Sequence, residues 1–247
     1  MKRSEIYRVV RPLALTSVVA IVISACTLVA RRSGIDPMVG LEVASAISVG
    51  AWMSLLARNL WRGHRLSEAM RPQTVAARVQ GIECRVAMGP GRSAFVLGAR
   101  HPTIYVGESL LNGLEQDELQ AILLHEEYHR RTYGPLRAAS LEAWITLARP
   151  IARVTKALAD RLVDLERAAD RYALGHGVTA AGIASALIKV EAAEVGSWVA
   201  FASAADRRVG GLLEFTAGRE RTPEHLPYEW LPPTVTVLTL ALCHVLG

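Results

Sequence analysis

The sequence predicts an α+β protein that is mostly helical, is held in a membrane by several helices and carries one domain with a small β-sheet. Three observations lead to this fold class. Hydrophobic residues make up 51% of the chain, uncharged apolar runs lie near both ends, and short strand-like runs precede a long region of helical periodicity between them. The formal net charge of +5 comes mostly from basic residues beside the N-terminal apolar runs, which favours lipid headgroups and does not indicate nucleic-acid binding.

Residues 1–60 are expected to form a transmembrane hairpin. The run 12–30 is uncharged, and the run 38–57 contains a single charge, Glu42. An α-helix rises about 1.5 Å per residue, so runs of this length span a hydrocarbon core of roughly 30 Å. Basic residues flank the hairpin on both outer sides, which places the following domain in the cytoplasm. The sequence therefore predicts a multi-pass protein of the cell membrane, with the lipid bilayer as a partner and the domain at the cytoplasmic face.

Two further features concern the ends of the chain. A lipoprotein signal ending at Cys26 is an alternative for the N-terminus, although the apolar run continues beyond Cys26 and a second run follows. Residues 231–247 are uncharged and apolar, and they form a third predicted membrane segment. The three cysteines, Cys26, Cys84 and Cys243, have no spacing typical of a disulfide framework or of a cysteine-ligated metal.

The domain between these segments is expected to cover residues 72–220. Short apolar runs separated by Gly and Pro predict a sheet of three strands, and helical periodicity follows. The charged stretch 137–158, with Pro150 inside it, is expected to be a bent amphipathic helix that packs on the domain or lies at a membrane interface. The predicted strands are 82–88, 93–97 and 103–106, and the predicted helices are 107–113, 115–131, 137–158, 160–175, 179–195 and 198–217.

The helix predicted at 115–131 contains His125-Glu126-Glu127-Tyr128-His129, which matches the pattern His-Glu-x-x-His. Acidic residues begin this helix and basic residues end it, as the helix dipole favours. Residues four apart lie one turn above one another, so both imidazoles face one point, and Glu126 lies about 100° round the axis beside that point. The arrangement is typical of a zinc site that has two histidine ligands and a glutamate as general base.

Catalytic zinc has three protein ligands and one open position, so the two histidines need another ligand. The zincins that use a third histidine six residues further on are excluded, because Pro135 occupies that position. Glu166 and Asp170 lie one turn apart in a later helical stretch, with small alanines between them. Glu166 is the expected third ligand, and Asp170 is expected to accept the free N–H of a zinc histidine. A solvated helix face is the alternative for this pair.

These residues predict a zincin-like metallopeptidase domain of the gluzincin type that binds one Zn2+ per chain and hydrolyses peptide bonds. Glu126 is expected to take the proton of a water that attacks a polarised peptide carbonyl. An extended substrate is expected to pair with an exposed edge strand, either 93–97 or 103–106. Tyr133 and His176 are the candidates for stabilising the oxyanion, although a structural role is more common for such residues. A non-catalytic, membrane-anchored zinc module that binds a partner is the alternative function.

Residues 93–106, followed by the His-Glu-x-x-His helix, resemble the membrane zinc metallopeptidases of the BlaR/MecR antirepressor type, over roughly residues 80–175. Two features depart from that type: the chain has no room for the extracellular sensor domain, and it shows two membrane helices before the domain where three are expected. The resemblance implies a zinc-dependent endopeptidase at the cytoplasmic face that cleaves a transcriptional repressor. It also implies roles for individual residues: His125, His129 and Glu166 as metal ligands, Glu126 as catalytic base and Asp170 as their support.

The sequence is also similar to the HtpX and CAAX prenyl protease type, through Glu166, Ala169 and Asp170 and through the strand Ile104-Tyr105-Val106. That similarity implies the same zinc chemistry. It differs in the substrates it implies, which are membrane or prenylated proteins, and in the role, which is membrane-protein quality control. The sequence contains no indication of an oligomeric state.

Overall fold

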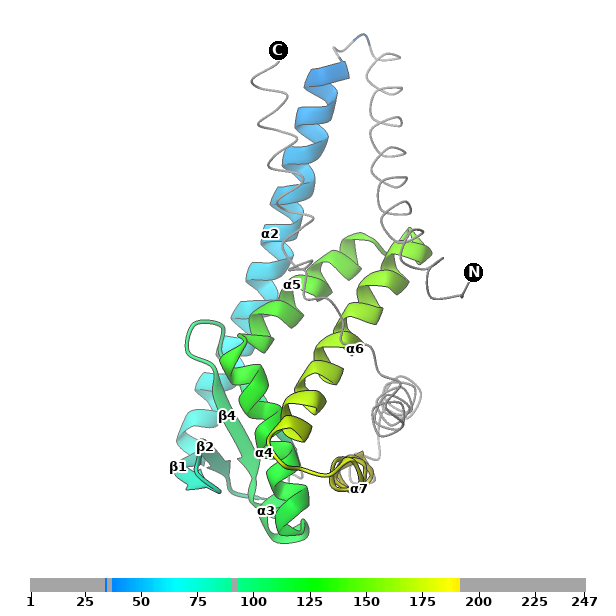
Figure 1. Cartoon of the computed structure of the whole chain (residues 1–247). Helices are drawn as coiled ribbons and strands as arrows, with labels where there is room; N and C mark the ends of the chain where they lie inside the picture. Colours follow the sequence, from blue (N-terminus) through cyan, green and yellow to red (C-terminus); the bar gives the residue numbers. More distant parts are fainter. Residues whose placement is uncertain (1–33, 35–36, 90–92, 192–247) are drawn as a thin grey trace, which may run out of the picture.

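The computed structural model describes residue 34 and residues 37–89 and 93–191. This part of the chain is a mostly helical α+β fold with one small mixed sheet (Figure 1), so the predicted secondary-structure class is confirmed. The elements in chain order are α2 (Pro37–Met70), the 3-10 turn η1 (Arg71–Gln73), β1 (Thr74–Val79), β2 (Ile82–Ala87), β3 (Ala94–Leu97), β4 (Thr103–Gly107), α3 (Glu108–Gly113), α4 (Gln116–Arg131), α5 (Gly134–Leu147), α6 (Ala152–Gly175) and α7 (Ala180–Glu191).

The sheet has the strand order β1-β2-β4-β3, with β2 and β4 parallel and the two outer pairs antiparallel. The three predicted strands are confirmed as β2, β3 and β4, whereas β1 is an additional strand. In this strand Thr74 is the only buried residue, and Val79 packs partly buried against a hydrophobic core cluster. Gln80 and Gly81, which join β1 to β2, both have positive φ, 47° and 83°, as in a two-residue type I′ hairpin turn.

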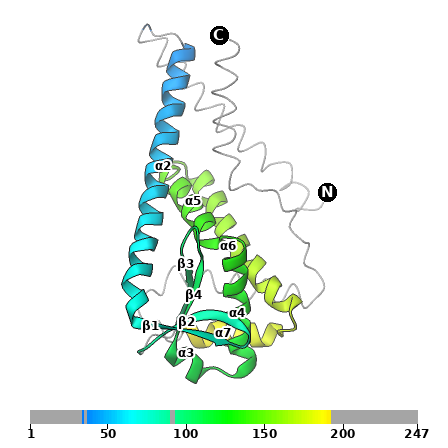
Figure 2. The ribbon, with the colours of Figure 1, turned by 90° about the vertical axis from the view of Figure 1, so that its left-hand side faces the viewer.

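Helix α4 lies between the sheet on one side and helices α6 and α7 on the other (Figures 1 and 2). On one side it shares a core cluster with the sheet and α3, formed by Cys84, Ile104, Val106, Leu110, Leu119 and Leu123. On another side it shares a second cluster with α6, α7 and the turn between them, formed by Ala121, Ala173, Val178, Ile183 and Ala186. Close packing on several sides makes α4 a rigid support for the motif it carries.

The stretch 137–158, predicted as one bent helix, contributes to two helices. Helix α5 ends at Leu147, and α6 runs without interruption from Ala152 to Gly175. Pro150 has no N–H to donate within a helix, and the turn before α6 is closed by the Ile151 N–H, which donates to the Ala148 carbonyl at 2.8 Å. The proline region therefore separates two helices, and the helix predicted at 160–175 is the second half of α6.

The run 38–57, predicted to be a transmembrane helix, forms the first part of α2. None of the helices that the structure describes is both long and apolar enough to cross a membrane. The prediction of a multi-pass membrane fold is therefore wrong for the described residues. The other predicted membrane segments, 12–30 and 231–247, and the helix predicted at 198–217 lie outside the described residues.

Part of the apolar surface of α2 is buried by contacts with α5. Trp52 is buried and stacks on Trp144 with 5.8 Å between the ring centroids. About two turns further on, the Asn59 side-chain amide donates a hydrogen bond to the Ala139 carbonyl at 3.3 Å. The apolar run thus continues into the charged second half of one long helix and packs against the domain.

Glu118 joins the first turn of α4 to α7. Its buried carboxylate, in a residue that is 4% exposed, accepts hydrogen bonds from the Glu115 N–H at 2.9 Å, from Ser185 Oγ at 2.5 Å and from Lys189 Nζ at 2.7 Å. The hydrogen bond from Lys189, followed by that from Ser185, lowers the pKa of Glu118 from 4.5 to about 2. The same carboxylate completes a capping box with Glu115, so one group stabilises both the helix end and the helix pair.

We expect Glu118→Gln to lower the free energy of unfolding by about 2 kcal/mol near neutral pH, because a charged hydrogen-bond partner of Lys189 is lost. The effect is smaller than the full pKa shift would give, because the Lys189 side chain is 41% exposed and solvent weakens its interaction with Glu118. The folded-state pKa is lowered, so the stabilisation is complete above pH 4.5 and disappears as the pH falls towards about 2. Urea unfolding of both proteins at about pH 7 and about pH 3 tests this expectation.

The matched control is Asp117→Asn, which removes a negative charge from the neighbouring exposed position of α4. Its unfolding free energy should stay within about 0.5 kcal/mol of the wild-type value. An equal difference between wild type and Glu118→Gln at both pH values would contradict the role assigned to the ionised carboxylate.

Candidate metal centre

Helix α4 brings His125 and His129 onto one face, as their spacing predicts. The two Nε2 atoms lie 3.2 Å apart, and the ring centroids are 4.8 Å apart. Both rings are largely removed from solvent, with 11% and 14% of the side-chain surface exposed. Two ring nitrogens this close and this buried point to one shared position between them.

Helix α6 brings two carboxylates to the same place. Glu166 Oε2 lies 3.2 Å from His125 Nε2, and Glu166 Oε1 lies 3.5 Å from His129 Nε2. The helices approach closely because Ala169 and Ala173, on the same face of α6, are fully buried. Asp170 is 3% exposed, so the alternative of a solvated helix face is wrong for this residue.

The three side chains His125, His129 and Glu166 could together hold a metal ion, because one ligand atom from each lies within 4.8 Å of the others. Ligand atoms that each lie about 2.0 to 2.1 Å from a tetrahedral ion are separated from one another by about 3.3 to 3.4 Å. The two histidine Nε2 atoms, 3.2 Å apart, match this spacing, and each also lies 3.2 or 3.5 Å from a different oxygen of the Glu166 carboxylate. The geometry suits more than one divalent ion and does not by itself distinguish zinc.

Asp170 determines which nitrogen of His125 faces the metal position. The His125 Nδ1 atom lies 2.9 Å from Asp170 Oδ1, so a proton on Nδ1 is donated to a buried carboxylate. The proton on Nδ1 leaves the lone pair on Nε2, the atom that faces His129 and Glu166. A carboxylate in this position also makes the imidazole a stronger metal ligand.

Glu126 is half-buried on α4 between the two histidines in sequence. On a helix its Cα–Cβ direction lies about 100° from that of His125 and about 60° from that of His129. The expected base therefore lies on the flank of the histidine face nearest His129.

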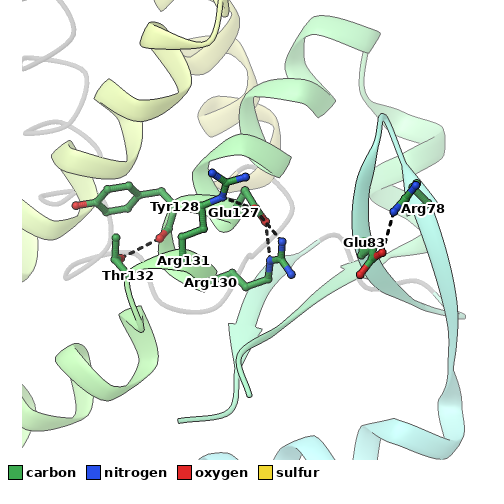
Figure 3. Close-up of polar contacts among 7 residues, drawn as sticks. All are labelled: Arg78, Glu83, Glu127, Tyr128, Arg130, Arg131 and Thr132. Atoms are coloured by element: carbon green, nitrogen blue, oxygen red, sulfur yellow. Dashed lines mark hydrogen bonds and ion pairs between the residues drawn. The ribbon is translucent and has the colours of Figure 1, made fainter. Parts of the chain in front are cut away.

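The last turn of α4 is held by ion pairs to the buried carboxylate of Glu127, which the sequence analysis does not identify. Figure 3 shows the Glu127 carboxylate between Arg130 and Arg131. Arg130 donates two hydrogen bonds to it, at 2.6 and 2.8 Å, and Arg131 donates one at 2.6 Å. Burial raises the pKa of Glu127, but the hydrogen bonds from Arg130 and Arg131 outweigh burial and the pKa is lowered overall. The ionised Glu127 therefore holds the helical turn that carries His129.

Gly134, at the start of α5, is a second residue that the sequence analysis does not identify. A Cβ atom at this position would lie 2.7 Å from His129 Nδ1 and 2.8 Å from His129 Cβ. The preceding residue, Tyr133, has the left-handed conformation with φ 54°, which turns the chain back towards α4. Only glycine lets the backbone pass so close to the ring, and the signal for it in the sequence is a glycine directly before Pro135.

The remaining predicted site residues are placed as follows. Tyr133 is 51% exposed and lines a cleft with Leu136 and with residues of the turn between β3 and β4. His176 is exposed at the end of α6, where its Nδ1 hydrogen-bonds the Tyr172 carbonyl at 2.7 Å, a contact that serves the helix end. Of the two candidate edge strands, 103–106 is wrong because β4 is paired on both sides, whereas 93–97 contains β3, which pairs on one side only in the described sheet.

We expect Gly134→Ala to weaken metal binding by about 10- to 100-fold, the range typical of disturbing a ligand's support. The added methyl group must displace the His129 ring or the start of α5. Zinc titration against a chromophoric chelator measures the affinity. Gly113→Ala is the matched control, because a Cβ there meets nothing within 4 Å, and equal zinc affinity of the two variants would contradict the role of Gly134.

Comparisons of the chain with protein-family models, with curated proteins and with solved structures found no match. The resemblance to the antirepressor peptidases and to the HtpX and CAAX type therefore rests on the sequence motifs alone. The candidate metal centre is supported separately, by the distances among the side chains of His125, His129, Glu166 and Asp170.

Proposed function

We propose that this protein is a zinc-dependent endopeptidase that hydrolyses peptide bonds in a protein substrate. The observation that carries the proposal is the triangle of ligand atoms from His125, His129 and Glu166, with Glu126 next to it in the His-Glu-x-x-His sequence. Two histidines and one carboxylate are a typical ligand set of catalytic zinc, which keeps a fourth position open.

The alternative of a purely structural zinc site is disfavoured by the same residues. Structural zinc usually has four protein ligands, and cysteine is common among them. In the described part of the chain the only cysteine is Cys84, which is buried in the core cluster between the sheet and α4. A glutamate beside the ligands has no role in a structural site, whereas hydrolysis needs a base there.

In the proposed reaction, different residues of the chain have different roles. When bound, zinc polarises a peptide carbonyl and lowers the pKa of a water ligand to about 7. Glu126 takes the proton of the attacking water and passes it to the nitrogen of the leaving amine. Asp170 holds His125 in the required tautomer, and Gly134 and Glu127 keep His129 in place, so the ligands need no rearrangement during the reaction.

Strand β3 is the proposed docking edge for the substrate. It lies at the end of the described sheet and packs beside α4. An extended peptide that adds to such an edge is held by main-chain hydrogen bonds, which do not demand a particular sequence. We therefore propose an unfolded or extended protein segment as substrate, and the repressor implied by the antirepressor resemblance is the first one to test.

We expect Glu126→Gln to keep about one zinc per chain and to lose hydrolysis by about 100-fold or more, the usual scale for removing a general base. Zinc content of the purified protein and cleavage of fluorescently labelled casein are the measurements. Asp117→Asn, on an exposed part of the same helix, is the control and should cleave at the wild-type rate. Full activity of zinc-loaded Glu126→Gln would remove Glu126 from the mechanism, and zinc-loaded wild type that cleaves neither casein nor repressor would favour the binding module.

We expect Glu166→Ala to lose zinc, because only two ligands remain, and Asp170→Asn to bind it about 10 to 100 times more weakly, because an amide oxygen is a weaker acceptor for the His125 N–H. Metal analysis after dialysis distinguishes a variant that has lost its zinc from one that binds zinc more weakly. Glu142→Gln, an exposed position on α5, controls for the loss of one carboxylate. Full zinc occupancy in Glu166→Ala would exclude Glu166 as a ligand.

A further inference from the structure

We propose that a cleft beside the metal centre binds an acidic side chain of the substrate, so that the enzyme prefers peptides with glutamate or aspartate at that position. The inference rests on the proposed peptidase function and adds a substrate class to it. Its basis is the position of the cleft and the chemistry of its walls.

The cleft has a volume of about 450 Å³ and is lined by Ala99, Arg100, Tyr133 and Leu136. The first two residues lie in the turn that follows β3, and the last two lie at the start of α5. The cleft therefore lies at the end of the proposed docking strand. It also lies next to the metal centre, since Tyr133 directly precedes the glycine whose backbone contacts the His129 ring.

The lining of the cleft is mostly apolar, and two of its four lining residues, Arg100 and Tyr133, carry polar groups, a guanidinium and a hydroxyl. In the described part of the chain neither group has a hydrogen-bond or ion-pair partner, and no acidic residue lines the cleft. Binding sites for small groups typically have apolar walls and a few converging polar groups. A phenol and a guanidinium can both donate hydrogen bonds, so the complementary group is an acceptor that carries negative charge.

The other arginines near the end of α4 differ from Arg100 in this respect. Arg130 and Arg131 both donate to Glu127, and Arg78 donates to Glu83 at 2.8 Å (Figure 3). Their charges are already matched within the protein. The charge of Arg100 has no such match among the described residues, and its planar fork of donors fits a carboxylate with two parallel hydrogen bonds.

Other side-chain classes fit the cleft less well. A lysine or arginine of the substrate would be repelled by Arg100. An aliphatic side chain would fill the apolar part but would remove water from the guanidinium without replacing its hydrogen bonds, which costs free energy. Glutamate and aspartate supply the missing acceptor, and the methylene groups of glutamate also contact the apolar walls.

The test uses the zinc-loaded full chain and pools of fluorescence-quenched peptides of about ten residues, in which one position at a time is held as Glu, Gln or Lys. At one position we expect kcat/KM to be about tenfold higher for Glu than for Gln, as expected for one charge-assisted contact at a partly exposed site. Arg100→Gln should remove this preference, and Arg100→Glu should shift it towards Lys. Arg149→Gln, exposed in the turn between α5 and α6, makes the same charge change away from the cleft and should keep the wild-type preference.

A second measurement keeps the proposal testable if no peptide is cleaved. Fluorescence anisotropy records the binding of labelled Glu and Gln pools to the zinc-loaded Glu126→Gln protein, with and without Arg100→Gln. Tighter binding of the Glu pool that depends on Arg100 would support the cleft even where the peptidase function fails. Equal cleavage of the Glu and Gln pools at every position, a preference that survives Arg100→Gln, or equal binding in the absence of cleavage would overturn it.

Discussion

The close packing of α6 against α4 is the contact on which the candidate site depends. Alanines at 169 and 173 are fully buried between the helices, so the backbones approach closely enough for Glu166 and Asp170 to reach His125 and His129. A larger side chain at either alanine would separate the helices and lengthen the distances from Glu166 to both histidines. The candidate metal centre therefore depends on the pairing of two helices, and no single element contains it.

The histidines are held by neighbours of different kinds. His125 is oriented by a hydrogen bond to a buried carboxylate, whereas the His129 ring lies close to the start of α5, where a Cβ at position 134 would come within 2.7 Å of its Nδ1. Glu127 and its two arginine partners stabilise the last turn of α4, which carries His129 and precedes α5. Because hydrogen bonding, steric contact and ion pairing all act on one helix turn, the ligands are positioned before any metal binds.

The surroundings of the centre are consistent with a peptide as the substrate. In the described sheet β3 pairs on one side only, and the cleft at the end of this strand is the proposed position for one substrate side chain. Main-chain pairing supplies affinity with little sequence demand, and a single charged contact supplies selection at one position. This division would allow one site to cleave several extended segments that share one acidic residue.

Several features of the site follow from local sequence patterns. The four-residue spacing of His125 and His129 and the four-residue spacing of Glu166 and Asp170 are helical repeats, so each pair shares a helix face wherever the helix lies. The helix ends of α4 are likewise encoded by neighbouring residues, such as the Glu115 and Glu118 capping box. The mostly helical α+β class and three of the four strands were predictable for the same reason.

Other features depend on residues that are far apart in the chain. The prediction of a membrane-spanning helix at 38–57 is wrong because the described helix that contains this run is not apolar enough over a sufficient length, and Trp52 in the run packs on Trp144 of α5. Strand β1 and the edge position of β3 depend on which strands pair, and the role of Gly134 depends on how closely α5 passes His129. The sequence by itself determined the two pairs of chemical groups and their helices. Only the tertiary structure decided that the pairs meet, because contacts between distant segments leave no periodic pattern in the sequence.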